Sequence, residues 1–457
     1  MTGKSGLIAL STRNIAKLKE LLATAASTFS RKLYIRFNPD QPRTDDVVGK
    51  IYLYSASQCP ELDVRVLTKV QNPEDYALIG DVIPEETQCV TPKYKRVVLG
   101  GTFDRLHNGH KVLLTKAAEI ASEKVVVGVT EKNMILKKSL YEMIEPVEHR
   151  MEKVVEFVED ITFNVKCIAE PIVDPFGPST RMEDLEAIVV SRETIKGADA
   201  VNRKRGEKGM SQLDVIVVEL VEGADEILHE TKISSSTKRR EALGTYLKPP
   251  KNFETSTGRP YVIGLTGGIA SGKSSIAKYL KEKHGFDVID CDKLAHSCYE
   301  PGSVLCQKIA ETFGTDVIVD GVVDRKKLGS IVFGDSTKLH QLSQLVWPVV
   351  QERAMKLVEQ STSQVAVIEA AALVEAGWHK QLPEVWTVFV PPEETIRRVM
   401  DRDSVSEDQA KARMASQITN KERIDNSNVV FCSLWEYTET RAQIDKAVKT
   451  LLERIQK

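Results

Sequence analysis

Two short stretches of the chain carry residue types suited to binding phosphate. "GGTFDRLHNGH", residues 100–110, places His107 and His110 three positions apart at a turn expected to enter a helix. "LTGGIASGKSS", residues 265–275, has glycines, a lysine and serines in the spacing G-x-x-x-x-G-K-[ST]. Both stretches put backbone N–H groups at a helix N-terminus, where anions bind. The sequence therefore predicts two separate phosphate sites in one chain.

The histidine pair suits an attack on the α-phosphate of a nucleotide. Residues three apart share a face of a helix, so both rings can line its first turn. Imidazoles there donate hydrogen bonds to phosphate oxygens and stabilise the charge that develops, without a covalent intermediate. A metal site and a purely structural pair are the alternatives. A metal is disfavoured because no third His or Cys lies near in the sequence.

A serine-rich stretch, "KISSSTKRR" at residues 232–240, follows the last expected strand of the same block. Ser234, Ser235 and Ser236 can cap a helix, with hydroxyl and N–H groups facing an incoming phosphate. Arg239 adds positive charge one turn further on. We expect these residues to complete the first site.

The second stretch has the sequence context of a P-loop. Gly267 and Gly272 let the backbone curl around phosphate, Lys273 neutralises charge, and Ser274 offers a hydroxyl to Mg²⁺. An apolar strand precedes the loop and an amphipathic helical pattern follows it, as a P-loop requires. A chance glycine turn is the alternative. The sequence predicts a site for Mg·ATP.

Three later features favour phosphoryl transfer over a nucleotide-dependent switch or motor. "VIDCDKLAH" places Asp290 and Asp292 two apart on an expected strand, so we expect both to project to one face. One of them can accept a proton or help to hold Mg²⁺. Glu369 ends a further apolar strand. A basic amphipathic stretch at 393–417 can close over the triphosphate with four arginines, Arg397, Arg398, Arg402 and Arg413.

The elements that must position these residues alternate between apolar strands and amphipathic helices. Alternating βαβ units predict parallel, doubly wound sheets that bind ligands at the carboxyl ends of the strands. Two proline-containing stretches, 72–95 and 247–260, look like connectors. We therefore expect three α/β parts: a smaller N-terminal region over 1–92, a Rossmann-like domain over 96–246 and a P-loop domain over 260–457.

Composition limits the possible partners and compartments. The chain has 457 residues, 63 basic and 65 acidic side chains and a net charge of −2, which gives no reason to expect nucleic acid or an anionic membrane. Seven cysteines without a Cys-x-x-Cys pair indicate reduced, intracellular thiols. No apolar run is long enough for a transmembrane segment. Before Pro39 the only acid is Glu20, as in a transit peptide, yet a strand over 6–10 and a helix over 15–26 favour a folded domain.

The last block resembles the dephospho-coenzyme A kinases through "GLTGGIASGKSS", "VIDCDKLAH", "GVVDRKKLGSIVF" and "VMDRDSVSEDQAKARMASQ". The resemblance implies phosphorylation of a ribose 3′-hydroxyl by ATP, with Asp292 as catalytic aspartate and Arg402 as lid arginine. Bacterial members usually have Asp where Glu369 stands and His-Pro where Trp347 and Pro348 stand, so the role of Glu369 stays open. The expected nucleotide, substrate and metal contacts of this site are Gly267, Gly268, Gly272, Lys273, Ser274 and Ser275 for the nucleotide, Thr266 and Asp290 for the substrate, and Ser274 for Mg²⁺.

The middle block resembles the nucleotidyltransferase superfamily, and within it the eukaryotic type of phosphopantetheine adenylyltransferase. The resemblance rests on "GGTFDRLHNGHKVLL", "LKKSLYEMIEPVEHR", "AIVVSRETIKGADAVNRKR" and "ISSSTKR". The bacterial enzyme has Thr where His107 stands, so His110 carries more weight. The resemblance implies phosphate or nucleotide contacts from Thr102, Phe103, His107, His110, Ser234, Ser235, Ser236 and Arg239, and substrate contacts from Lys137 and Arg192.

The whole chain resembles the bifunctional coenzyme A synthases of animals, including an N-terminal region with "LYIRF" and "LDVRVL". The resemblance implies adenylylation of 4′-phosphopantetheine followed by phosphorylation of dephospho-coenzyme A, with ATP as co-substrate and Mg²⁺ as cofactor. A nicotinamide nucleotide adenylyltransferase joined to a riboside kinase, and a nucleotide-binding scaffold with decayed sites, are the alternatives. We expect a cytoplasmic protein, with mitochondrial association open, and assign to residues 1–92 a regulatory role or contacts with proteins or membrane surfaces.

Overall fold

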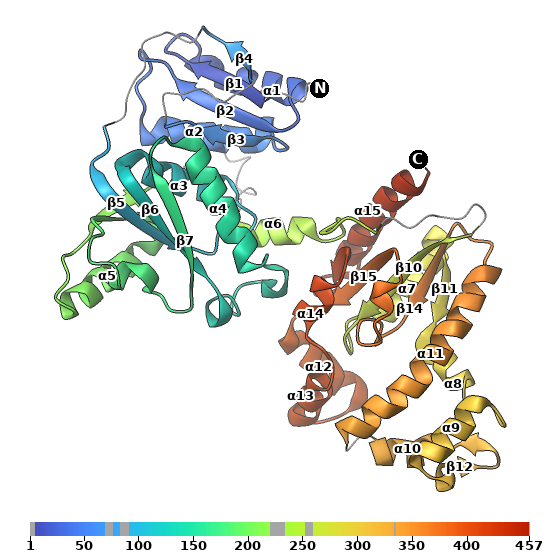
Figure 1. Cartoon of the computed structure of the whole chain (residues 1–457). Helices are drawn as coiled ribbons and strands as arrows, with labels where there is room; N and C mark the ends of the chain where they lie inside the picture. Colours follow the sequence, from blue (N-terminus) through green and yellow to red (C-terminus); the bar gives the residue numbers. More distant parts are fainter. Residues whose placement is uncertain are drawn as a thin grey trace. The chain divides into compact units, whose positions relative to one another are not determined.

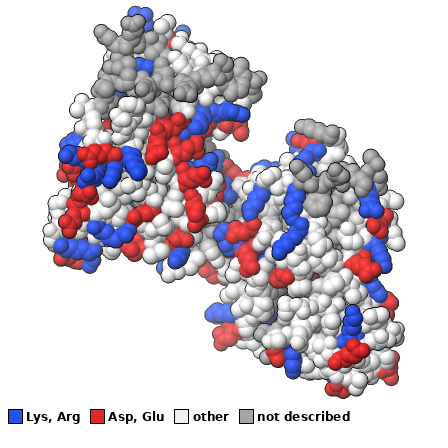
Figure 2. All heavy atoms as spheres, viewed as in Figure 1, with Lys and Arg blue, Asp and Glu red and all other residues white. Residues whose placement is uncertain are grey.

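The computed structural model describes residues 5–68, 76–82, 91–219, 234–251, 259–332 and 335–456. It divides into two compact units, Met1–Arg239 and Arg240–Lys457, which are considered separately (Figure 1). Within the described residues, no helix combines the length and the apolar character needed to cross a membrane. Acidic and basic side chains are interspersed on the face shown in Figure 2, in keeping with the nearly balanced composition.

The first unit begins with a small parallel sheet in the order β3-β2-β1-β4. Its elements are β1 (Ser5–Leu10), α1 (Leu18–Thr28), β2 (Lys32–Phe37), α2 (Asp45–Gln58), β3 (Asp63–Val66) and β4 (Tyr76–Gly80). Thr44 caps α2 by accepting a hydrogen bond from the backbone N–H of Val47 at 3.3 Å. The folded interpretation of the N-terminus is confirmed from residue 5 onward. We call residues 5–82 the N-terminal lobe.

The prediction that 72–95 is only a connector is wrong for Tyr76–Gly80. This segment forms β4, which pairs with β1 in parallel from Ser5↔Tyr76 to Ala9↔Gly80. The short apolar run "YALIG" satisfies the open edge of β1, and this long-range pairing outweighs the local signal from the prolines and acids around it. Residues 69–75 and 83–90 of the expected connector lie outside the described part of the chain.

A second, five-stranded parallel sheet follows in the order β7-β6-β5-β8-β9. The elements of this second lobe are β5 (Tyr94–Gly101), α3 (Asn108–Ile120), β6 (Ala121–Thr130), α4 (Val147–Ile161), β7 (Lys166–Ile172), β8 (Ala187–Ser191), α5 (Ile195–Glu207), β9 (Asp214–Val218) and α6 (Ser235–Ala242), of which the residues up to Arg239 belong to the first unit. The strand order reverses at β5, and ligands bind at such a switch point in doubly wound sheets. The histidine motif directly follows β5.

The two lobes of the first unit share one hydrophobic core. Leu22, Ile51 and Tyr52 from the N-terminal lobe belong to the same cluster of buried side chains as Leu114 and Phe157 from the second lobe. Helix α2 packs against α3 (Figure 1). The described residues of the expected N-terminal region therefore share one core with the second lobe and belong to the same compact unit.

The second unit is built on a parallel sheet in the order β11-β14-β10-β15-β16. Its strands are β10 (Tyr261–Gly267), β11 (Asp287–Asp290), β14 (Val365–Glu369), β15 (Glu384–Phe389) and β16 (Val429–Cys432), with the small hairpin β12 (Ile318–Val319) and β13 (Val322–Val323). Its helices are α7 (Lys273–His284), α8 (Cys291–Ser297), α9 (Val304–Phe313), α10 (Arg325–Val332), α11 (Ser336–Gln360), α12 (Pro392–Asp403), α13 (Glu407–Ala415), α14 (Asn420–Asp425) and α15 (Tyr437–Ile455). The predicted succession of parallel α/β folds is confirmed.

Residues 240–251 belong to the second unit, so the division falls earlier than the expected boundary at 246. The backbone N–H of Gly244 donates to the carbonyl of Val430 at 2.9 Å. The Tyr246 hydroxyl donates to Glu384 at 2.7 Å. These bonds attach the segment before the expected second connector to the sheet. The connector's first residue, Leu247, likewise donates from its backbone N–H to the carbonyl of Asn428 at 2.7 Å, whereas residues 252–258 lie outside the described part.

Candidate active sites

The turn after β5 brings the two histidines into contact. Their ring centroids are 3.9 Å apart and the rings are stacked, and the ring of Phe103 lies 5.1 Å from that of His110. Phe103 has a backbone φ of +49°, in the left-handed region that side chains rarely adopt. The surrounding packing holds this conformation, because Phe103 is buried in the shared core. Such strained turns cluster at functional sites.

Both histidines are neutral near pH 7. Burial, followed by the charge of Lys238, lowers the pKa of His107 to about 4. Burial, followed by the charges of His107 and Lys138, lowers the pKa of His110 well below its ordinary value of 6.5. The Nδ1 atoms of both rings are buried and have no hydrogen-bond partner within the described residues. Buried polar atoms normally have a partner, so these two indicate a ligand.

The serine-rich stretch reaches the histidine turn. The Ser235 hydroxyl lies 3.3 Å from Nε2 of His107. Arg239 Nη2 donates to the Ser236 hydroxyl at 3.2 Å, and its Nη1 forms an ion pair with Asp104 at 2.6 Å. Asp104 and Arg239 are almost completely buried, so this pair joins the start of α6 to the motif. Arg239 was predicted to bind the nucleotide, and here its charge is engaged by Asp104, a residue that the sequence analysis missed.

Four other predicted residues of the first site differ in their surroundings. Thr102 is buried, and its hydroxyl accepts a hydrogen bond from Thr130 at 3.0 Å. Lys137 is exposed, while its neighbour Lys138 supplies the charge that acts on His110. Arg192 follows β8, is exposed and forms an ion pair with Glu219. The Ser234 hydroxyl caps α6 by accepting from the backbone of Thr237 at 3.2 Å.

The loop between β10 and α7 is closely packed. A Cβ atom at Gly267 would lie 2.5 Å from the Ser271 hydroxyl and 2.6 Å from the carbonyl of Val388, so only glycine fits. Gly272 has a φ of +88°, which glycine adopts without strain. Gly268 is packed more loosely, with Arg423 Nη1 3.4 Å from such an atom. The loop thus has the tight curl that a P-loop needs to direct its N–H groups at phosphate.

A buried ion pair lies at the start of α7. Lys273 Nζ lies 2.7 Å from Glu369 and 3.3 Å from Asp292. The Ser274 hydroxyl donates to the same Glu369 oxygen at 2.8 Å. Two carboxylates and a hydroxyl are ligands that Mg²⁺ prefers, so this donor set fits the predicted ion. The sequence left the role of Glu369 open, and the structure places it in contact with both P-loop side chains.

The prediction that Asp290 and Asp292 share a strand face is wrong. Strand β11 ends at Asp290, which caps α8 by accepting a hydrogen bond from the backbone of Lys293 at 2.9 Å. Asp292 is therefore in the first turn of a helix. Burial raises the pKa of Asp290, but the hydrogen bonds and charge of Lys293 outweigh it, so the net pKa is lowered. Because helix α8 begins directly after Asp290, only Asp292 of the two aspartates forms an ion pair with Lys273.

The predicted lid arginines fall on α12 and α13. Arg398 donates to the carbonyl of Ala270 in the P-loop at 3.4 Å and to the Ser433 hydroxyl at 2.9 Å. Arg402 and Arg413 both pair with Asp403, and Arg397 pairs with Glu394. The structure therefore brings Arg398 to the phosphate loop, and the side chain of Arg402 is half exposed.

Two residues near the P-loop, Gln417 and Arg423, were not predicted as site residues, whereas Thr266 and Ser275 were. Gln417 accepts a hydrogen bond from the backbone of Ile269 at 2.8 Å, and buried Arg423 pairs with Glu375 at 2.9 Å. The only sequence signal for them was position, because Gln417 ends the basic stretch 393–417 and Arg423 lies in α14, which follows it. Thr266 is buried, with its hydroxyl donating to the carbonyl of Ala371 at 3.1 Å. Ser275 lies in the first turn of α7.

No group of three or more His, Cys, Asp or Glu side chains suited to a metal ion occurs in the part of the chain that the structure describes. The six cysteines in this part of the chain are all buried and free.

In comparison with known proteins, the two blocks match the models of different families. Residues 98–242 match the model of the cytidylyltransferase-like family, and residues 261–433 match that of the dephospho-CoA kinases. A dephospho-CoA kinase of Carboxydothermus hydrogenoformans is 39% identical over 187 residues, 40% of this chain and 90% of that protein. One from Shouchella clausii is 44% identical over 160 residues, 34% of this chain and 81% of that protein. A solved dephospho-CoA kinase from Campylobacter jejuni is 25% identical, covers 42% of this chain and 96% of its own, and has a TM-score of 0.32.

Proposed function

The chain belongs to the dephospho-coenzyme A kinase family, and from this we propose that it catalyses the last two steps of coenzyme A biosynthesis. In the first unit, 4′-phosphopantetheine and ATP give dephospho-coenzyme A and pyrophosphate. In the second unit, dephospho-coenzyme A and ATP give coenzyme A and ADP. The observation that carries the proposal is the succession of a cytidylyltransferase-like lobe and a dephospho-CoA kinase unit in one chain, since the product of the first reaction is the substrate of the second.

In the first reaction, a phosphate oxygen of 4′-phosphopantetheine attacks the α-phosphorus of ATP and pyrophosphate leaves. His107 and His110, being neutral, each donate one hydrogen bond to the oxygens that gain charge in the transition state. The Ser235 and Ser236 hydroxyls lie on the side of the leaving pyrophosphate, at the N-terminus of α6. Thr102 and Phe103 shape the nucleotide pocket, and Lys137 and Arg192 bind the substrate phosphate. Positioning and charge stabilisation supply most of the catalysis.

In the second reaction, the γ-phosphoryl group of ATP passes to the 3′-hydroxyl of the dephospho-coenzyme A ribose. Asp292 accepts the proton of that hydroxyl, and Lys273 neutralises charge on the transferred group. Ser274 and Glu369 would hold Mg²⁺, which would neutralise phosphate charge when bound. Arg398 and Arg402 stabilise the phosphates from the side of α12. Thr266 and Asp290 support the substrate side of the site.

A nicotinamide nucleotide adenylyltransferase joined to a riboside kinase would use the same two fold types. The identity of the second unit to dephospho-CoA kinases, 39% over nearly the full length of one relative, supports the coenzyme A assignment instead. A scaffold with decayed sites is disfavoured because both sites retain their charged and hydrogen-bonding side chains.

The test is to incubate the purified chain with Mg·ATP and 4′-phosphopantetheine and to follow the products by mass spectrometry. We expect dephospho-coenzyme A to form and then to convert into coenzyme A, with release of pyrophosphate and ADP. Turnover of nicotinamide mononucleotide and its riboside, with none of 4′-phosphopantetheine, would overturn the assignment and leave the two folds in place. Turnover of neither set would favour a scaffold.

A further inference from the structure

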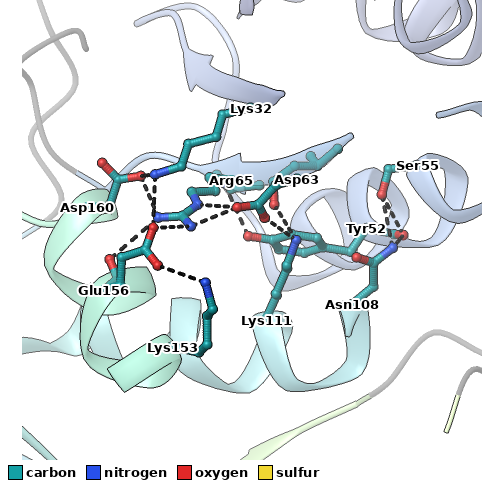
Figure 3. Close-up of polar contacts among 12 residues, drawn as sticks. Lys32, Tyr52, Ser55, Asp63, Arg65, Asn108, Lys111, Lys153, Glu156 and Asp160 are labelled. Carbon is teal, nitrogen blue, oxygen red and sulfur yellow. Dashed lines mark hydrogen bonds and ion pairs between the residues drawn. The ribbon is translucent and has the colours of Figure 1, made fainter. Parts of the chain in front are cut away.

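The first turn of α3 is held by contacts from outside the second lobe, to which α3 belongs (Figure 3). Asn108, directly after His107, donates from Nδ2 to the carbonyl of Tyr52 at 2.7 Å and to the Ser55 hydroxyl at 3.1 Å. Both acceptors belong to α2 of the N-terminal lobe. The backbone position next to one histidine is therefore fixed by two hydrogen bonds to the other lobe.

A second anchor lies directly after His110. Lys111 Nζ forms an ion pair with Asp63 on β3 at 2.6 Å and donates to the carbonyl of Val64 at 3.2 Å. Lys111 is only 6% exposed, and its burial lowers its pKa while Asp63 opposes this. A buried charge is tolerated only when its partner is held in place, so this pair fixes geometry strongly.

The acceptors are themselves rigidly held. Asp63 accepts two bonds from Arg65 at 2.9 and 2.7 Å, and Arg65 pairs with Asp160 at 2.6 Å and Glu156 at 3.2 Å on α4. Lys32 on β2 pairs with the same two α4 carboxylates (Figure 3). The N-terminal lobe thus binds both α3 and α4 through ion pairs and hydrogen bonds.

The anchored turn borders open space. His107 and Lys111 line a cavity of about 930 Å³ together with Ser55 and Asp63 of the N-terminal lobe and Lys238 of α6. The anchors are therefore at the edge of the candidate site, where a shift of the turn changes the position of the histidines.

We propose that the N-terminal lobe is a positioning element of the first active site, with Asn108 and Lys111 as its positioning residues. This rests on the proposed function. Residues 107 and 110 share one face of the first turn, and residues 108 and 111 share the face beside it. The N-terminal lobe binds the face with residues 108 and 111. It thereby determines the position at which His107 and His110, on the neighbouring face, contact phosphate. A displacement of about 1 Å at such a site costs on the order of 100-fold in rate.

The test uses variants on the N-terminal side that leave the histidine motif intact. Asp63→Asn removes the charge that holds Lys111, and Ser55→Ala removes one acceptor of Asn108. Tyr34→Phe is the matched control, because the Tyr34 hydroxyl donates to Asp160 of α4 at 2.8 Å across the same lobe boundary. Each full-length variant is assayed for adenylyl transfer to 4′-phosphopantetheine and, separately, for phosphorylation of dephospho-coenzyme A.

We expect Asp63→Asn to lower kcat of adenylyl transfer about 10-fold or more, with KM for ATP changed less than about twofold, since misplacement affects the transition state. Ser55→Ala is expected to lower it by a smaller factor, and Tyr34→Phe to leave it unchanged. Kinase turnover stays unchanged in all three. Equal kcat in Asp63→Asn, Ser55→Ala and wild type, or an equal loss in Tyr34→Phe, would overturn the positioning role.

A second readout does not depend on the substrate. In wild-type protein labelled at histidine, NMR titration gives the pKa values of His107 and His110, and we expect both to move in Asp63→Asn and to stay constant in Tyr34→Phe. Unchanged values in Asp63→Asn contradict the proposal even if the chain proves inactive on 4′-phosphopantetheine, whereas inactivity alone contradicts only the proposed function. Should Asp63→Asn fail to fold, the double variant Ser55→Ala with Lys111→Met replaces it, because Asp63 then keeps Arg65 as its partner.

Discussion

At the scale of single residues, the neutral histidine pair is the feature with the clearest measurable consequence. Burial lowers the pKa of His107 to about 4, whereas the unfolded chain keeps a value near 6.5. Between these two values the unfolded state binds a proton that the folded state does not. The free energy of unfolding is therefore unaffected by His107 above about pH 6.5, and it decreases as the pH falls from 6.5 toward 4.

We predict that the free energy of unfolding of the first unit falls more steeply with acid in the wild type than in His107→Asn. The extra loss between pH 6.5 and pH 4 is at most about 3 kcal/mol for a shift of this size. Denaturant unfolding of both proteins at several pH values measures it. Parallel pH profiles would show that His107 does not resist protonation in the folded state.

His110 is expected to serve only the first reaction. We predict that His110→Ala lowers adenylyl transfer by about 100-fold or more, the usual cost of losing a donor to the transition-state charge. Phosphorylation of added dephospho-coenzyme A should stay at the wild-type rate, which is the control within the same chain. Loss of both activities in a folded variant would contradict the separation of the two sites.

Lys273 gives the reciprocal case. Its Nζ pairs with Glu369 and Asp292 in the second unit. We predict that Lys273→Ala converts 4′-phosphopantetheine to dephospho-coenzyme A and stops there, because the P-loop charge that stabilises phosphoryl transfer is gone. Product analysis by mass spectrometry reveals the accumulated intermediate. Continued formation of coenzyme A would show that Lys273 is dispensable.

At the scale of elements, strands and the turns after them could be predicted, but caps and pairings could not. Apolar runs such as those of β5, β6 and β14 are typical of buried parallel strands, and the glycine and histidine motifs fix where the following helices begin. The end of β11 was missed because Asp290 stops the strand by capping α8, which a strand pattern of two-residue spacing does not reveal. β4 was missed because its pairing with β1 depends on residues about 70 positions away.

The cap of α8 leads to a prediction that separates two roles of Asp290. If its role is to cap the helix that carries Asp292, Asp290→Ala lowers the free energy of unfolding by about 1 kcal/mol and also lowers kinase turnover. Asp290→Asn retains both the stability and the turnover, since Asn caps a helix as well as Asp does. Kinase assays and thermal unfolding of the two variants measure this. Equal loss in Asp290→Asn would instead favour the substrate contact predicted from the sequence.

At the scale of the whole molecule, the shared core makes the N-terminal lobe part of the first unit. The sequence analysis separated them because the proline-containing stretch 72–95 looked like a connector, and packing between distant helices leaves no local pattern. Ser55, Asp63 and Lys111 lacked any signal for the same reason. The assignment of this lobe to contacts with proteins or membrane surfaces remains a prediction.

A core substitution in the N-terminal lobe should therefore act on the neighbouring lobe. Ile51 is fully buried in the shared cluster. We predict that Ile51→Ala destabilises the first unit by about 2–5 kcal/mol, the usual cost of such a cavity. Adenylyl transfer is then lost at a lower temperature, while the temperature at which kinase activity is lost is unchanged. Inactivation of adenylyl transfer at the wild-type temperature would show that the two lobes unfold independently.

The packing of α2 against α3 also bears on how the chain folds during its synthesis. The N-terminal lobe emerges from the ribosome first. The side of α2 that meets α3 has no cover until α3 is complete at Ile120, and the side of β3 that meets α4 has none until Ile161, about 80 residues after the lobe. At ~5–20 residues per second, this interval lasts on the order of 5–20 s. During that time an apolar surface of the nascent chain is exposed, because the helix that covers it has not yet been synthesised. Chaperones that bind apolar surfaces can bind the nascent chain in this interval.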